Sequence, residues 1–147
     1  MTVYFECTTR TTMSQERLFD LSRSIDTHTG SMAKSRETAI AGVTSGVISE
    51  GEEVTWRAWH FGIPLRMTSR ITEMQAPLRF VDEQVRGPFK HFRHVHEFTS
   101  ENSGAVMVDR IEFSAPFGII GRVLEQLILA KYLQRLIAVR NSYIAAA

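Results

Sequence analysis

The feature that most constrains the fold is a long run of strand-like segments followed by a single long helix-like segment. From residue 36 to residue 114, segments rich in β-branched and aromatic residues alternate with turns rich in glycine, proline and polar residues. An antiparallel sheet built from such segments has two faces, and one of them has to be covered. We place six strands in this region, near 36–48, 52–61, 64–74, 78–86, 89–99 and 104–114.

The cover for the sheet is predicted at the end of the chain. Residues 117–145 contain no proline, and their apolar residues recur at intervals of three and four, the spacing of an amphipathic helix. Residues 3–11 read as a first strand, Ser14 can cap a short helix after it, and residues 25–35 hold a second short helix or a turn. The predicted fold class is α+β: a curved antiparallel sheet of about seven strands wrapped around a long C-terminal helix, with one or two short helices after the first strand.

Composition limits the class of protein. A chain of 147 residues suits one domain, 1–147, that can bury a core. The net charge is +1 and the basic residues are scattered, which is unlike a nucleic-acid-binding protein. Cys7 is the only cysteine, so no internal disulfide can form. We see no secretory signal and no apolar run that could span a bilayer, so we expect a cytoplasmic protein without stable membrane insertion.

The segment "HFRHVHEF", residues 91–98, places two histidines on the apolar face of a predicted strand. If residues 100–103 form a four-residue loop, His94 lies opposite Asp109 on the next strand. A register shifted by two residues would instead pair His96 with Asp109. The two imidazoles and the carboxylate share the buried face in either register, because a shift of two keeps the faces unchanged.

The segment "HFGIPL", residues 60–65, predicts a second hairpin. Pairing His60 with Leu65 makes one face of the two strands mostly apolar and the other polar. His60 then points inward at the end of an apolar strip. Trp59 and Phe61 point outward, where a homodimer contact and tolerated exposed apolar area are both open interpretations.

The order of elements resembles the START-like, helix-grip fold of the SRPBCC superfamily, which includes pollen-allergen-like proteins, lipid-transfer domains and polyketide cyclase/dehydrase-like proteins. The detailed similarity is to a bacterial subgroup of this superfamily. It lies in "VTWRAWHFGI" (54–63), "ITEMQAPLRFVDEQVRGPF" (71–89), "HFRHVHEF" (91–98) and "MVDRIEFSAPFGIIG" (107–121). The resemblance implies a cavity between the sheet and the last helix, in which members hold lipids, quinones, polyketides or aromatic small molecules. Some members are enzymes and many only bind and carry.

We therefore predict a protein that binds or carries a small hydrophobic or amphipathic molecule in that cavity. The polar end of the ligand is expected to meet His94, His96 and Asp109, and His28 lies either at the surface or at the entrance. The predicted ligand-binding residues are on the inner face of the sheet and the first part of the last helix: Trp56, His60, Met67, Phe92, His94, His96, Phe98, Met107, Asp109, Ile111, Phe113, Phe117 and Leu124.

Three interpretations of His94, His96 and Asp109 remain open from the sequence. They could form a metal site, an acid–base pair, or a hydrogen-bonded network in the cavity wall. We favour the network, and we expect no metal and no cofactor. The acid–base pair would make the protein a cyclase or dehydrase-like enzyme, with these three residues as catalytic candidates, whereas we expect a binding protein. A partner-binding accessory module is a further alternative, and it would have little empty volume inside.

Overall fold

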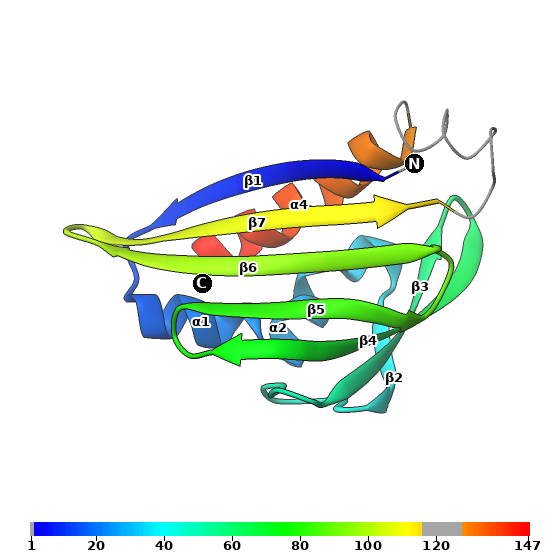
Figure 1. Ribbon diagram of the computed structural model, residues 1–147, viewed down its shortest axis with the longest axis horizontal. Coiled ribbons are helices and arrows are strands. Elements are labelled where there is room, and N and C mark those ends of the chain that lie inside the picture. The colour runs from blue at the N-terminus through cyan, green and yellow to red at the C-terminus, as the bar shows by residue number, and fades with distance from the viewer. Residues whose placement is uncertain (1, 116–127) are drawn as a thin grey trace.

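The structure is a computed structural model, and it describes residues 2–115 and 128–147. Seven strands form one antiparallel sheet in the order β1-β7-β6-β5-β4-β3-β2 (Figure 1). This architecture confirms the predicted helix-grip fold of class α+β. The elements are β1 (Val3–Thr11), α1 (Gln15–Ser22), α2 (Ile25–Ser31), the short 3-10 helix η1 (Ala33–Ser35), β2 (Thr38–Gly42), β3 (Glu53–His60), β4 (Ile63–Gln75), β5 (Arg79–Arg86), β6 (His91–Glu101), β7 (Gly104–Ser114) and α4 (Ala130–Ala145).

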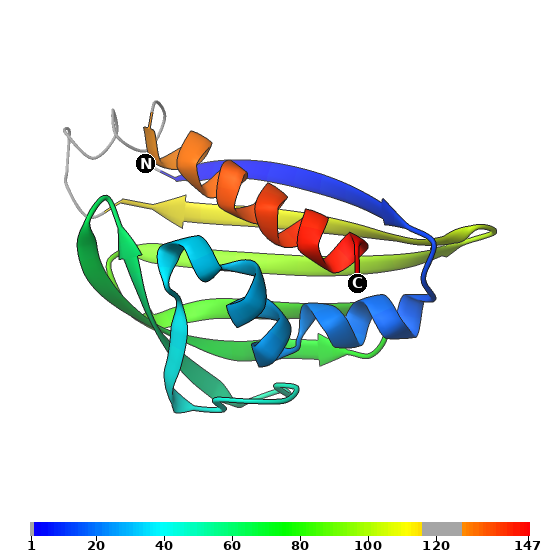
Figure 2. The same cartoon turned by 180° about the vertical axis from the view of Figure 1, so that it is seen from behind.

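The described helices lie on one face of the sheet, as Figures 1 and 2 show from opposite sides. Helix α4 packs along β1, and α1 and α2 pack against α4. The predicted last helix spans residues 117–145, and α4 ends at the predicted residue. Its predicted beginning, with the proposed ligand contacts Phe117 and Leu124, lies outside the described residues. No helix among the described residues is long and apolar enough to cross a membrane.

The hairpin between β3 and β4 is tighter than predicted. His60 pairs with Ile63 and not with Leu65. The reason is a two-residue turn in which Phe61 and Gly62 both have positive φ, 54° and 74°. Two consecutive left-handed residues make the type I′ turn that matches the twist of a hairpin, and glycine adopts it without strain. Since the register moves by two residues, the inward face stays the same.

The hairpin between β6 and β7 differs from the prediction in the same way. Glu101 pairs with Gly104, so the loop contains two residues and not the four of 100–103. His96 therefore lies opposite Asp109, which corrects the favoured pairing of His94 with Asp109 and matches the alternative register.

Strand β2 is shorter than the predicted strand 36–48. It ends at Gly42, which has a φ of 74° and lies against β3, so a Cβ atom there would be 2.2 Å from the carbonyl oxygen of Glu53. The chain then leaves the sheet in a loop. Ile48 returns from this loop into the core, where it is 3% exposed.

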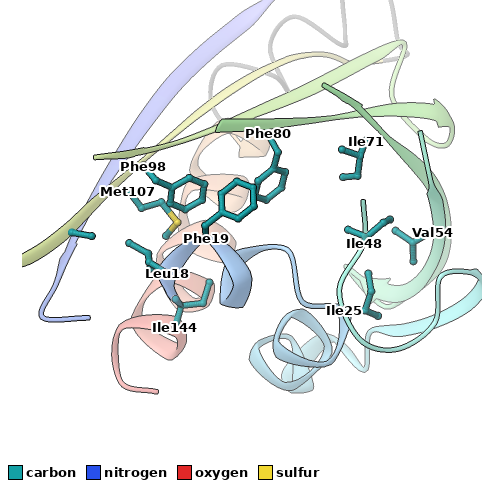
Figure 3. Packing of buried hydrophobic residues seen from close by; sticks show 11 residues of the cluster. Leu18, Phe19, Ile25, Ile48, Val54, Ile71, Phe80, Phe98, Met107 and Ile144 are labelled. Carbon is teal, nitrogen blue, oxygen red and sulfur yellow. The ribbon is translucent and has the colours of Figure 1, made fainter. Parts of the chain in front are cut away.

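Two apolar clusters hold the helices on the sheet. In the first, the ring of Phe19 on α1 meets Phe80 and Phe98 edge-on, with centroid distances of 5.5 and 5.2 Å (Figure 3). In the second, Ile111 and Phe113 of β7 are fully buried and pack with Phe5 of β1 against the residues of α4. Each such side chain contributes about 1.5–3 kcal/mol on burial. Both clusters extend to the middle of the sheet, where they include Ile71 of β4 and Phe92 of β6.

Candidate functional site

A cavity of about 440 Å³ lies between the inner face of the sheet and the helices. This volume is within the range of small-molecule sites. Strands β3 to β6, the α1–α2 region and α4 supply its wall. Most of the lining is apolar: Ile25, Met32, Ile48, Val54, Trp56, Ala58, Phe61, Ile63, Leu65, Met67, Ile71, Phe80, Pro88, Phe89, Phe92, Leu129, Leu133, Leu136 and Ile137.

The structure divides the predicted ligand-binding residues into two groups. Trp56, His60, Met67, Phe92, His94 and His96 border the cavity, and so does His28. The other described members lie behind the wall because α1 and α4 cover the part of the sheet to which they belong. Their exposed fractions are between 0% and 3%, and they are Phe98, Met107, Asp109, Ile111 and Phe113.

Asp109 is the centre of a buried polar network behind the cavity wall. Its Oδ1 accepts a hydrogen bond from Nε2 of His94 at 2.7 Å, and its Oδ2 accepts one from Nδ2 of Asn141 at 2.8 Å. Nη1 of Arg140 lies 3.5 Å from Oδ1. Burial alone would raise the pKa of Asp109, but the imidazoles of His94 and His96 and the charge of Arg140 hold it well below its usual range. Asp109 is therefore a carboxylate at neutral pH.

The two histidines form a stack inside this network. Their rings lie 3.7 Å apart at 18°, and Phe80 stacks on the other side of His96 at 4.0 Å and 13°. Nε2 of His96 is bonded to Oδ2 of Asp82 at 2.7 Å. Nδ1 of His96 is buried without a hydrogen bond to a described residue, 3.3 Å from Oδ1 of Asp109. Two carboxylates, one from each of the strands that flank β6, thus fix the orientation of the stack.

The proton on His94 can be placed from its partners. A carboxylate only accepts hydrogen bonds, so Nε2 of His94 carries the proton that is donated to Asp109. Burial and the neighbouring His96 lower the pKa of His94 below its ordinary value of 6.5, which leaves the ring neutral at pH 7. Nδ1 then has a free lone pair. No described residue is hydrogen-bonded to it, and His94 borders the cavity, so Nδ1 is an acceptor available to a ligand.

Asp82 supplies a second acceptor beside it. Burial would raise the pKa of Asp82, but the hydrogen bond from His96 and the electrostatic interactions with the two imidazoles and Arg140 lower it, so the group is ionised at pH 7. Oδ2 is bonded to His96, and Asp82 borders the cavity. We call Asp82, His94 and His96 the inner polar end of the cavity.

The inner polar end contains donor atoms that a metal ion could use. One ligand atom from each of Asp82, His94 and His96 lies within 4.8 Å of the others. However, the two rings are stacked nearly parallel, so the in-plane lone pairs of their nitrogens do not converge on one point. A shared metal would also displace the hydrogen bond between His96 and Asp82. The present geometry favours the hydrogen-bonded network.

A second polar group lies on the wall near the β3–β4 turn. Nδ1 of His60 and the hydroxyl of Tyr132 on α4 are 2.6 Å apart. Nε2 of His28 lies 3.0 Å from Oε1 of Glu37, and the ring of His28 is tilted against Trp56 at 4.4 Å. Tyr132 belongs to α4, whereas His28, Glu37, Trp56 and His60 come from other parts of the chain. The helix and the sheet therefore meet at this part of the cavity wall. We call His28, Glu37, His60 and Tyr132 the outer polar end.

Trp59 and Phe61 are both exposed, as the sequence predicts, with exposed fractions of 37% and 61%. The guanidinium of Arg36 lies 4.9 Å from the Trp59 ring. Phe61 sits in the turn, and its ring packs against Tyr132 at 4.6 Å. Phe61 also borders the cavity, so it is a surface residue at the edge of the cavity, next to Tyr132.

The sequence-based prediction missed Asp82, Arg140, Asn141, Glu37 and Tyr132. Asp82 was detectable, because it alternates with buried Phe80 and so points inward from its strand. Arg140 was also detectable as a cation on the apolar stripe of the last helix. Glu37 follows no such pattern, because it lies between elements.

The buried network makes stability depend on pH. The charged or titratable groups around His94 are His96, Asp82, Asp109 and Arg140. The folded state keeps His94 neutral below pH 6.5, where the unfolded chain binds a proton, so stability falls as the pH drops below that value. The lowered pKa values of Asp82 and Asp109 continue the loss as the pH falls through 3.8. Urea unfolding at about pH 7.5, 5.5 and 4.5 should give steadily lower free energies, and equal values would contradict the assignment.

No family model matches the sequence, and no curated protein matches it. Several solved structures are similar. The protein TTHA0849 from Thermus thermophilus is 16% identical, with a TM-score of 0.73 over 99% of this chain and 98% of that chain. The major latex-like protein 151 from Panax ginseng is 13% identical, with a TM-score of 0.72 over 99% and 97%. The di-domain ARO/CYC StfQ from the steffimycin biosynthetic pathway is 12% identical, with a TM-score of 0.73 over 99% of this chain and 50% of that chain. Similarity at these identities shows a shared fold.

Proposed function

We propose that this chain, which has the helix-grip fold of the SRPBCC superfamily, binds a small amphipathic molecule in its internal cavity. The observation that carries the proposal is the combination of an apolar cavity of about 440 Å³ with two acceptors at its inner end, Nδ1 of His94 and the carboxylate of Asp82. Nδ1 of His94 has no hydrogen-bond partner among the described residues, and the Asp82 carboxylate has acceptor capacity beyond its bond to His96, so both can accept a hydrogen bond from a ligand in the cavity. The partner is a hydrogen-bond donor such as a phenol or an enol.

Replacing His94 by phenylalanine tests this proposal. Phenylalanine keeps a ring of similar size beside His96 but removes the acceptor. We expect the affinity for naphthol to fall about threefold to tenfold, the value of one hydrogen bond, and the affinity for naphthalene to stay unchanged. Fluorescence titration measures both probes in both proteins. Naphthol binding that is equally tight in the variant would contradict the role of His94.

Acid–base catalysis is a second candidate, and one observation favours it. A buried Asp109 carboxylate orients His94 so that its free nitrogen is the one available to a ligand, which is the arrangement of an oriented general base. Turnover separates the two functions: a binding protein returns its ligand unchanged, and an enzyme alters it. The partner-binding alternative has less support, because it requires little empty volume.

A further inference from the structure

We infer that the ligand has two polar ends: a hydroxyl that donates at the inner polar end and a carbonyl that accepts at the outer polar end, joined by a rigid ring system. This inference rests on the proposed binding function and adds the class of ligand, a hydroxyaryl ketone. Both polar ends border the same cavity.

The distance between the inner and outer polar ends can be estimated along the axis of helix α4. Tyr132 belongs to the outer end, and Arg140 reaches Asp109 behind the inner end. The two residues are eight positions apart (140 − 132) in one continuous helix, which is about 12 Å along its axis. Leu133, Leu136 and Ile137 lie between them and border the cavity. A two-ring aromatic body with a substituent at each end matches this apolar interval.

The outer polar end always has a hydrogen-bond donor to offer. Burial lowers the pKa of His60 and raises that of Tyr132, so at pH 7 the pair holds one ring proton and one hydroxyl proton. One of these two protons lies in the 2.6 Å bond between Nδ1 of His60 and the Tyr132 oxygen. The second proton is on Nε2 of His60 or on the Tyr132 hydroxyl, according to the tautomer, and it can be donated to a ligand. No described residue accepts it.

The sheet residues of the inner polar end offer hydrogen-bond acceptors to a ligand and no free donor. Nε2 of His94 and Nε2 of His96 already donate to carboxylates, and what remains is a lone pair and a carboxylate oxygen. Arg140 borders the cavity but directs its terminal nitrogens to Ser22, Asn141 and Asp109. The inner polar end therefore offers acceptors, and the His60–Tyr132 pair offers a donor at the outer polar end, where the Glu37 carboxylate is hydrogen-bonded to His28. This difference gives the cavity a direction.

Four naphthalene probes test this direction. They are naphthalene, naphthol, acetylnaphthalene, and a hydroxy-acetylnaphthalene with its hydroxyl and ketone at opposite ends of the ring pair. The variant is His60→Phe combined with Tyr132→Phe, because either residue alone could still donate. The control is Trp59→Phe, on the same strand as His60 and facing away from the cavity.

We expect the double variant to bind both ketones about threefold to tenfold more weakly than wild type, and to bind naphthol and naphthalene unchanged. Unchanged naphthol binding also shows that the variant is folded. The Trp59→Phe protein should match wild type for every probe. If naphthol binds but the ketone adds nothing in wild type, or if the double variant loses naphthol as strongly as the ketones, the two-ended ligand is wrong and the proposed binding function stands. If none of the probes binds, the proposed function fails together with the inference.

Discussion

Replacing Asp109 by alanine is expected to lower the free energy of unfolding by about 3–5 kcal/mol, the cost of removing one partner from a buried charged network. Asp109 is fully buried and is in contact with His94, Asn141 and Arg140. Without it, the guanidinium of Arg140 and the N–H group of His94 remain buried without their carboxylate. Because Arg140 and Asn141 belong to α4, the loss also loosens the helix from the sheet. Urea denaturation at pH 7 measures the effect.

Glu112 gives a matched control on the same strand. Its side chain is 43% exposed, and Nε2 of His91, also 43% exposed, lies 3.8 Å from its carboxylate. Removing a surface contact of this kind changes stability by no more than about 0.5 kcal/mol. If Asp109→Ala and Glu112→Ala have equally small effects, the network around Asp109 does not hold α4 on the sheet.

Filling the cavity from both walls is expected to weaken ligand binding strongly. Ala58 borders the cavity from β3 and Leu136 borders it from α4. Phenylalanine at position 58 and tryptophan at position 136 would occupy the space of a ring system, so a ligand could enter only by straining a packed interior. We expect the affinity of the double variant for naphthol to fall by about 100-fold, which corresponds to roughly 2.8 kcal/mol. Isothermal titration calorimetry measures this loss.

The control for the filled protein is Val139→Trp on the same helix. Val139 is 46% exposed, so tryptophan there adds bulk without entering the cavity. This variant should bind naphthol as wild type does. Undiminished binding by the filled protein would mean that the ligand sits elsewhere on the molecule.

The fold could be predicted from the sequence because local residue patterns determine its strands and helices. Period-two alternation predicted the strands, and intervals of three and four predicted the last helix. The shared inward face of His94, His96 and Asp109 also followed from alternation, since it survives a register error of two residues. The register of the β3–β4 hairpin was wrong because the turn at Phe61 uses a left-handed conformation that is rare for residues with a side chain. Nothing in the residues around "HFGIPL" indicates so short a turn.

The boundary between core and cavity was not predictable from the sequence. Phe92 borders the cavity and Phe113 does not, although the two face each other across neighbouring strands. What separates them is the position of α4, and that position depends on contacts between segments far apart in the chain. Alternation indicates that Asp82 points inward, but its hydrogen bond to His96 was not predictable, because His96 belongs to a different strand.

The crystal structure of the protein with naphthol bound is the most direct measurement of the central claim. The account predicts the ring system between α4 and strands β3 to β6, with the hydroxyl oxygen about 2.7–3.2 Å from Nδ1 of His94 or from the carboxylate of Asp82. Naphthol bound only on the outer surface, or a cavity that is closed by side chains, would contradict it.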